Sequence, residues 1–123
     1  MKIAIPIKSK KVMLNFSEAK QIKLYDILDD KIDSSRIIDI EEDTYIGICK
    51  ILHLEKVDLL LVSRINESAK DLLEFLKINV LSGCVGDETV VLKNFLRNKH
   101  LILEEYNNSK DKLINSSCDD YCS

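Results

Sequence analysis

Four cysteines and two histidines are the residues best suited to metal chemistry in this chain. Cys118 and Cys122 are separated by three residues, and two thiolates at that spacing can chelate a soft metal such as zinc, copper(I) or iron. A structural zinc site needs four ligands, usually with two residues between paired cysteines, so this pair would need ligands from elsewhere. The alternative is a polar segment with exposed thiols.

Two further places carry a cysteine. Cys84 lies between Gly83 and Gly86, where it would be a soft ligand in a tight loop just before a helix, or a small apolar residue packed in the core. Cys49 and His53 are four residues apart on a predicted helix, so they can share one side of it. A buried cysteine beside a boundary histidine is the ordinary reading of that second pair.

Hydrophobic periodicity predicts the elements that must position these residues. Three strands are expected first, over residues 3–7, 22–28 and 32–40, with the second and third forming a hairpin. Helices and strands then alternate: helix 44–55, strand 57–62, a helix capped by Asn66, strand 78–81 and a helix capped by Asp87. The predicted fold class is therefore α/β, with the order β-β-β-α-β-α-β-α and a mixed five-stranded sheet covered by helices on both faces. Residues 100–106 fit either a further strand or an extension of the last helix.

Length and composition limit the classes of protein that the chain can represent. Its 123 residues suit one domain, which we expect over residues 1–106, followed by a flexible tail over 107–123 that contains the last two cysteines. A net charge of −3 with interspersed signs argues against nucleic-acid binding. No apolar run is long enough to span a membrane, and no signal peptide is recognisable, so we expect a cytoplasmic protein with reduced cysteines.

Three predicted loops should meet at one edge of the sheet, because each follows a parallel strand. They cover residues 6–11, 63–66 and 82–87, and open α/β sheets bind ligands at this carboxyl edge. Lys8, Lys10, Lys11 and Arg64 would make the edge positive, and helix starts at this edge would add to that. The edge would suit an oxyanion or an anionic cluster. The alternative is a solvated lysine loop and an arginine paired with a nearby acid.

Catalytic sites that this fold class often carries are missing from the sequence. The first strand, Ile3-Ala4-Ile5, has none of the carboxylates that a two-metal nuclease needs. The acidic pair of a phosphoacceptor receiver is also missing, as are a Walker loop and a dinucleotide-binding glycine motif. We therefore expect a protein that is not an enzyme.

Several segments resemble one known family. The opening Met1-Lys2-Ile3-Ala4-Ile5-Pro6 is similar to the start of the dinitrogenase iron–molybdenum cofactor biosynthesis domain. Asn15-Phe16-Ser17 stands where that family usually has His-Phe-Gly, and Ser63-Arg64-Ile65-Asn66 stands where Gly-Gly-Ile-Gly is common. Gly83-Cys84-Val85-Gly86-Asp87 resembles the family's final glycine loop. The resemblance extends over residues 1–97.

The resemblance implies a ribonuclease H-like three-layer α/β/α architecture and a non-catalytic accessory role. Such proteins bind or carry an iron–sulfur or molybdenum–iron cluster, or its anionic precursor, together with cofactor-assembly proteins. The ligand-binding residues expected here are Lys8, Asn15, Ser63, Arg64, Asn66, Gly83, Gly86 and Asp87, and the expected metal ligands are Cys84, Cys118 and Cys122. Asn15 replaces a nitrogen ligand with an amide. The alternative is therefore a diverged ligand- or protein-interaction module that kept the fold and lost the metal.

Overall fold

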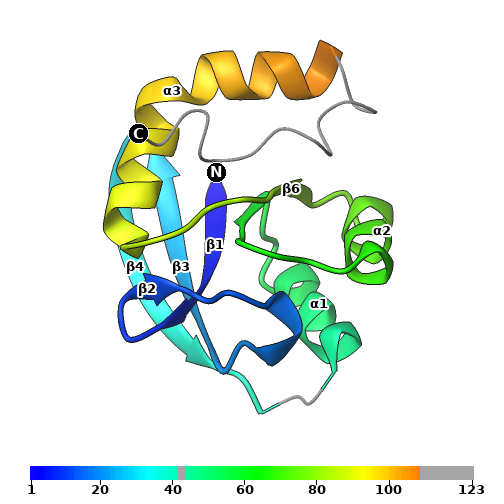
Figure 1. Cartoon of the computed structure of the whole chain (residues 1–123). Helices are drawn as coiled ribbons and strands as arrows, with labels where there is room; N and C mark the ends of the chain where they lie inside the picture. Colours follow the sequence, from blue (N-terminus) through cyan, green and yellow to red (C-terminus); the bar gives the residue numbers. More distant parts are fainter. Residues whose placement is uncertain (42–43, 109–123) are drawn as a thin grey trace.

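The computed structural model describes residues 1–41 and 44–108 (Figure 1). The first half of the chain contains β1 (Lys2–Lys8), β2 (Lys11–Val12), the short 3-10 helix η1 (Phe16–Glu18), β3 (Gln21–Leu28) and β4 (Lys31–Asp39). The second half contains α1 (Tyr45–Leu54), β5 (Leu59–Leu61), α2 (Glu67–Phe75), β6 (Asn79–Leu81) and α3 (Glu88–Asn108). The predicted order of strands and helices is confirmed, apart from the addition of β2 and η1.

The strands form one mixed sheet in the order β4-β3-β1-β5-β6. β1, β5 and β6 are parallel, whereas β3 and β4 extend the sheet on the other side as an antiparallel hairpin. The five strands of this path are the predicted ones, but β2 pairs with β1 as a sixth strand. The expectation of a plain loop at residues 11–12 was therefore wrong, because a two-residue strand is too short to produce a hydrophobic period.

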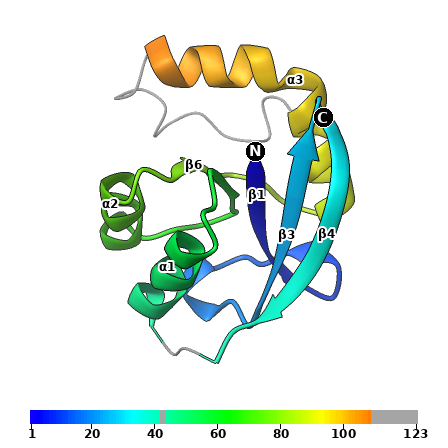
Figure 2. The same ribbon diagram turned by 180° about the vertical axis from the view of Figure 1, so that it is seen from behind.

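The helices cover both faces of the sheet, as the three-layer architecture requires. Figures 1 and 2 show α1 and α2 together on one face and α3 along the other. Ala4, Leu24 and Leu60 belong to the buried cluster that packs beneath α1 and α2. Their sheet neighbours Ile3 and Leu59 belong to the cluster that packs beneath α3. β1 thus contributes to both cores, which explains why its sequence is continuously apolar and does not alternate.

Tight turns close the two hairpins of the sheet. Ser9 and Lys10 join β1 to β2 with φ values of +52° and +68°, and Asp29 and Asp30 join β3 to β4 with φ values of +52° and +65°. Two successive left-handed residues match the right-handed twist of a hairpin. The first turn brings Lys8 directly opposite Lys11 across the ladder.

The last helix settles the open question about residues 100–106, which are helical. α3 runs to Asn108, which is two residues beyond the predicted domain boundary at residue 106. Cys118 and Cys122 lie outside the described residues. Within the described part of the chain, no helix combines the length and apolar character needed to cross a membrane.

Candidate functional site

The segment that follows β2 and the loop that follows β5 are joined by backbone hydrogen bonds at the carboxyl edge of the sheet. The amide of Arg64 donates to the carbonyl of Leu14 at 2.9 Å, and the amide of Phe16 donates to the carbonyl of Arg64 at 3.0 Å. This short parallel bridge holds Asn15 beside Arg64. Phe16 is 1% exposed, so its ring fixes η1 to the core while the residues on either side remain exposed.

The loop after β6 is hydrogen-bonded both to the loop after β5 and to β2. The amide of Gly83 donates to the carbonyl of Ser63 at 2.9 Å, which continues the parallel ladder beyond β5. On the other side, the amide of Val12 donates to the carbonyl of Gly86 at 2.8 Å. The three predicted loops therefore meet at one edge, and their backbones form a single bonded framework.

Asn15 lines two of the cavities that open on this framework. The first, which we call the Arg64 cavity, measures about 230 Å³ and is lined by Asn15, Phe16, Ser17, Arg64, Ile65 and Asn66. The second, the Lys8 cavity, measures about 430 Å³ and is lined by Lys8, Lys11, Val12, Met13, Leu14, Asn15, Glu18 and Gly86. Five of the eight predicted ligand-binding residues line one or both of these cavities, whereas Ser63, Gly83 and Asp87 line neither.

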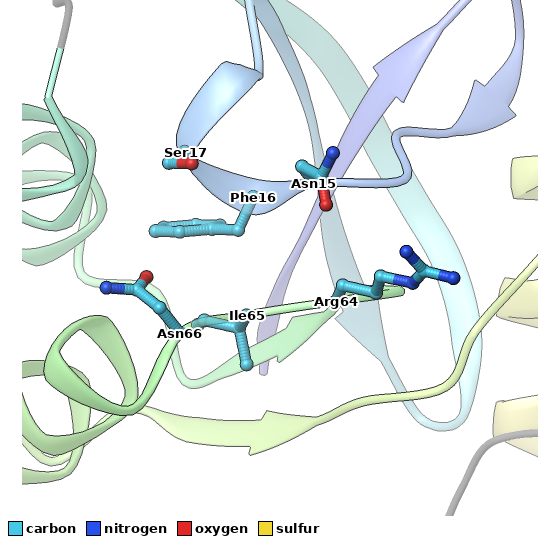
Figure 3. Close-up of a pocket in the computed structure, with 6 residues that line it drawn as sticks. All are labelled: Asn15, Phe16, Ser17, Arg64, Ile65 and Asn66. Carbon is cyan, nitrogen blue, oxygen red and sulfur yellow. The ribbon is translucent and has the colours of Figure 1, made fainter.

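The side chains of the Arg64 cavity extend in different directions. The amide nitrogen of Asn15 donates to the Glu18 carboxylate at 3.1 Å. Figure 3 shows the Asn15 oxygen turned toward the segment that carries Arg64. The Arg64 side chain extends away from the Phe16 ring, and Asn66 lies on the opposite side of the cavity (Figure 3). The Arg64 guanidinium therefore lies on the side of the cavity away from Phe16 and Asn66 (Figure 3).

The two predicted helix caps behave differently. Asp87 accepts hydrogen bonds from the amides of Thr89 at 2.9 Å and Val90 at 3.2 Å, so it caps α3 as expected. Hydrogen bonds from the amide of Val90, and then from the side chain and the amide of Thr89, hold the pKa of the Asp87 carboxyl below its usual range. Asn66 occupies the cap position of α2, but its side chain makes no capping hydrogen bond and lines the Arg64 cavity instead. The start of α3 is therefore already satisfied by this chain's own carboxylate.

Three of the four predicted cations at the edge form no ion pair with an acid among the described residues. Arg64, Lys8 and Lys11 are exposed, and none of them forms an ion pair with a described carboxylate. The alternative in which Arg64 pairs with a nearby acid is therefore not what the described residues show. Uncompensated cations around a hollow attract an anion more strongly than paired ones, since no internal salt bridge must be broken first.

Comparison with known proteins identifies the family. A family model described as dinitrogenase iron-molybdenum cofactor matches residues 1–98. The chain belongs to this family. The match covers most of the described chain, and it confirms the resemblance seen in the opening strand and the glycine loop. The family is of an accessory or cofactor-binding type and is associated with the handling of the iron–molybdenum cofactor.

Several solved structures share the fold of this chain. The protein PH0822 is 19% identical with a TM-score of 0.76, over 80% of this chain and 90% of that one. The MJ0327 protein of Methanocaldococcus jannaschii is 22% identical with a TM-score of 0.66, over 80% of this chain and 90% of that one. The apo form of the orange protein from Desulfovibrio gigas is 15% identical with a TM-score of 0.63, over 80% of this chain and 86% of that one. No curated protein sequence matches the chain.

Among the predicted metal ligands, Cys84 belongs to the described residues, and it lines neither of the two cavities. Cys84 is fully buried in the core under α3, and its thiol donates to the carbonyl of Leu81 at 3.6 Å. Cys49 is also fully buried, and burial raises the pKa of its thiol to about 11. Among residues 1–41 and the described side chains that follow residue 43, no three His, Cys, Asp or Glu side chains converge in a way that could hold a metal ion.

One buried polar group was missed by sequence reasoning. The hydroxyl of Tyr25 on β3 donates to the carboxylate of Glu88 in the first turn of α3, and Lys23 Nζ lies 3.9 Å from that carboxylate. Burial raises the pKa of Tyr25, with further contributions from the hydrogen bond and charge of Glu88. The only signal in the sequence was a tyrosine among apolar residues on the buried side of an alternating strand. Met13 and Glu18 were also missed, because they lie in a segment that reads as a polar loop.

Proposed function

We propose that this chain is a non-catalytic accessory protein that binds an anionic metal cluster, or the oxyanion from which it is made, at the carboxyl edge of its sheet. The observation that carries the proposal is the group of exposed cations without acid partners among the described residues, Arg64, Lys8 and Lys11. They surround two cavities whose walls are tied together by backbone hydrogen bonds. The membership of the chain in the iron–molybdenum cofactor family supports the metal-containing character of the cargo.

The residues at the edge take distinct parts in this proposal. Arg64 supplies the charge for the Arg64 cavity, and Asn15 and Asn66 line its two sides. Ser63 and Gly83 act through the backbone bond that fixes the loops, while Asp87 holds the start of α3. A guanidinium fits this task because it stays charged and offers several N–H donors in a plane.

The cysteines form a separate part of the proposal. Cys118 and Cys122 would hold a metal as a second point, and Cys84 remains a third candidate ligand despite its burial. The protein would act in the cytoplasm with other cofactor-assembly proteins, which would deliver the cluster and receive it.

Binding of tetrathiomolybdate and molybdate to the purified full chain under anaerobic conditions tests the proposal. Equilibrium dialysis followed by metal analysis gives the affinity, and Arg64→Gln should weaken it about tenfold, because a hydrogen-bonded charge contributes ~1.5 kcal/mol. The matched control is Arg36→Gln on β4, which removes an arginine paired with Glu55 and should change the affinity less than about twofold. Equal affinities for the native protein and Arg64→Gln would contradict the proposal.

Serine variants locate any metal that survives desalting. Loss of metal from Cys118→Ser/Cys122→Ser places it at that pair, and loss from Cys84→Ser places it in the loop. The alternative function, a ligand- or protein-interaction module that no longer binds metal, is favoured by Asn15, whose oxygen rather than a nitrogen faces Arg64 (Figure 3). A folded protein that binds neither molybdenum anion nor any metal would establish that alternative.

A further inference from the structure

The Lys8 cavity has an electrostatic feature that the Arg64 cavity lacks. Lys8 and Lys11 are partners across the β1–β2 ladder, so their side chains leave the same face of the hairpin and both line the cavity. Like charges directly opposite one another destabilise a ladder. Neither lysine has an acid partner within the described residues, and the one acid of the cavity wall, Glu18, accepts a hydrogen bond from Asn15.

The hairpin that carries this lysine pair is held rigidly. The amide of Met13 donates to the carbonyl of Pro6 at 2.8 Å, and the amide of Glu88 donates to the carbonyl of Lys10 at 3.0 Å. Together with the bond from Val12 to Gly86, these contacts tie the hairpin to β1, to the glycine loop and to the start of α3. The two lysine backbones therefore stay close together, and the repulsion is not relieved by the hairpin opening.

The rest of the cavity has space and an apolar wall. Gly86 has a φ of +98°, and a Cβ built on it would meet no atom within 4 Å, so the cavity is open above it. Val12, Met13 and Leu14 supply apolar lining, and Leu14 is 59% exposed. A volume of about 430 Å³ is within the range of small-molecule sites and is much larger than one inorganic oxyanion needs.

We propose that the Lys8 cavity is a separate subsite for a phosphate-bearing small organic molecule, whose phosphate lies between Lys8 and Lys11 and whose apolar part contacts Met13 and Leu14. A dianionic phosphate relieves the repulsion between the two ammonium groups, which a single negative charge would do less well. This subsite rests on the proposed function only in taking the carboxyl edge as an anion-binding edge. It takes a different ligand from the Arg64 cavity, although the two cavities share Asn15 in their linings.

Titration of the full-length, nitrogen-15-labelled protein with inorganic phosphate and with phenyl phosphate tests the subsite. The amide chemical-shift changes should centre on Lys11, Leu14 and Gly86. Phenyl phosphate should bind more tightly than inorganic phosphate. The dissociation constant of inorganic phosphate should be on the order of millimolar, because the site is exposed. Lys11→Gln should weaken both ligands about tenfold. Leu14→Ser should weaken phenyl phosphate alone.

The β3–β4 hairpin provides a matched control. Lys31 follows a turn of the same left-handed type but pairs with Leu28 instead of a second lysine. Lys31→Gln removes the same charge and should leave both affinities unchanged. Equal losses in Lys11→Gln and Lys31→Gln, or shifts centred on Arg64, would overturn the subsite.

Arg64→Gln separates this inference from the proposed function. It should retain phenyl phosphate binding and weaken tetrathiomolybdate binding about tenfold, whereas Lys11→Gln should weaken phenyl phosphate binding about tenfold. Failure of phenyl phosphate with intact tetrathiomolybdate binding rejects the subsite alone. Failure of tetrathiomolybdate with intact phenyl phosphate binding rejects the proposed cargo alone.

Discussion

The hydroxyl of Tyr25 joins the first turn of α3 to β3, and its removal tests how that helix is held. Tyr25 is 4% exposed and donates to the carboxylate of Glu88, which is itself 5% exposed. Tyr25→Phe leaves this buried carboxylate with Lys23, 3.9 Å away, as its charged neighbour. Because a hydrogen bond to a charged group contributes ~1.5–3 kcal/mol, we expect the free energy of unfolding to fall by ~2 kcal/mol at neutral pH.

The same substitution should change how stability depends on pH. Burial first, and then Glu88, raises the pKa of Tyr25 above its usual value of about 10. The folded protein therefore holds the phenol proton more tightly than the unfolded chain does. The contribution of the Tyr25 phenol to the free energy of unfolding is fully present below pH ~10, and above that pH it falls by ~1.4 kcal/mol per pH unit. The difference in free energy of unfolding between the native protein and Tyr25→Phe should therefore narrow above pH ~10.

Urea unfolding followed by circular dichroism at pH 7 and at several values above pH 10 measures both effects. Tyr45→Phe is the control, because Tyr45 on α1 is half-buried and its hydroxyl has no hydrogen bond to the described residues. That variant should lose less than ~0.5 kcal/mol. A similarly small loss in Tyr25→Phe, or a gap that stays constant above pH 10, would refute the account of this contact.

Three further outcomes follow from the described contacts. Asp87→Ala should lower the thermal midpoint more than Asp87→Asn, and the stability that Asp87 adds should be lost as the pH falls below ~4, since its folded pKa is depressed. Gly86→Ala should cost ~1 kcal/mol in urea unfolding through its left-handed backbone alone, because no atom obstructs the added methyl group. Cys49 and Cys84 should resist alkylation in the native protein and react on unfolding, as peptide mass mapping would show.

The fold could be predicted because its central strands carry unambiguous sequence patterns. Ile3-Ala4-Ile5 and Leu59-Leu60-Leu61 are continuously apolar, which is typical of strands covered by helices on both faces, and both lie at the centre of the sheet. β2 could not be predicted, because its two residues pair through the turn at Ser9 and Lys10 and through Gly86, which is far away in sequence. Contacts of that kind leave no local hydrophobic period.

The candidate site was predicted in position but not in detail. The loops at the carboxyl edge were found from topology alone, because parallel strands must end together. The sequence predicts both Asn66 and Asp87 as helix caps, but of these two side chains Asp87 alone accepts hydrogen bonds from its helix. Whether a cap residue makes these bonds depends on its side-chain geometry, which the residue type does not determine. The presence of two separate cavities at this edge could not be predicted from the sequence either, because it depends on where η1 places Asn15.

Asn15 decides what kind of binding this edge can perform. It stands where the family usually has a histidine, and its amide nitrogen is committed to Glu18, which leaves the amide oxygen toward Arg64 (Figure 3). A turned amide would bring that oxygen against the Glu18 carboxylate, so the observed orientation is the favourable one. An amide oxygen is a poor ligand for a soft metal, whereas Arg64 and the lysine pair act on charge. The proposed binding at this edge is therefore binding of an anion by electrostatic contact and hydrogen bonding, and not direct coordination of its metal by Asn15.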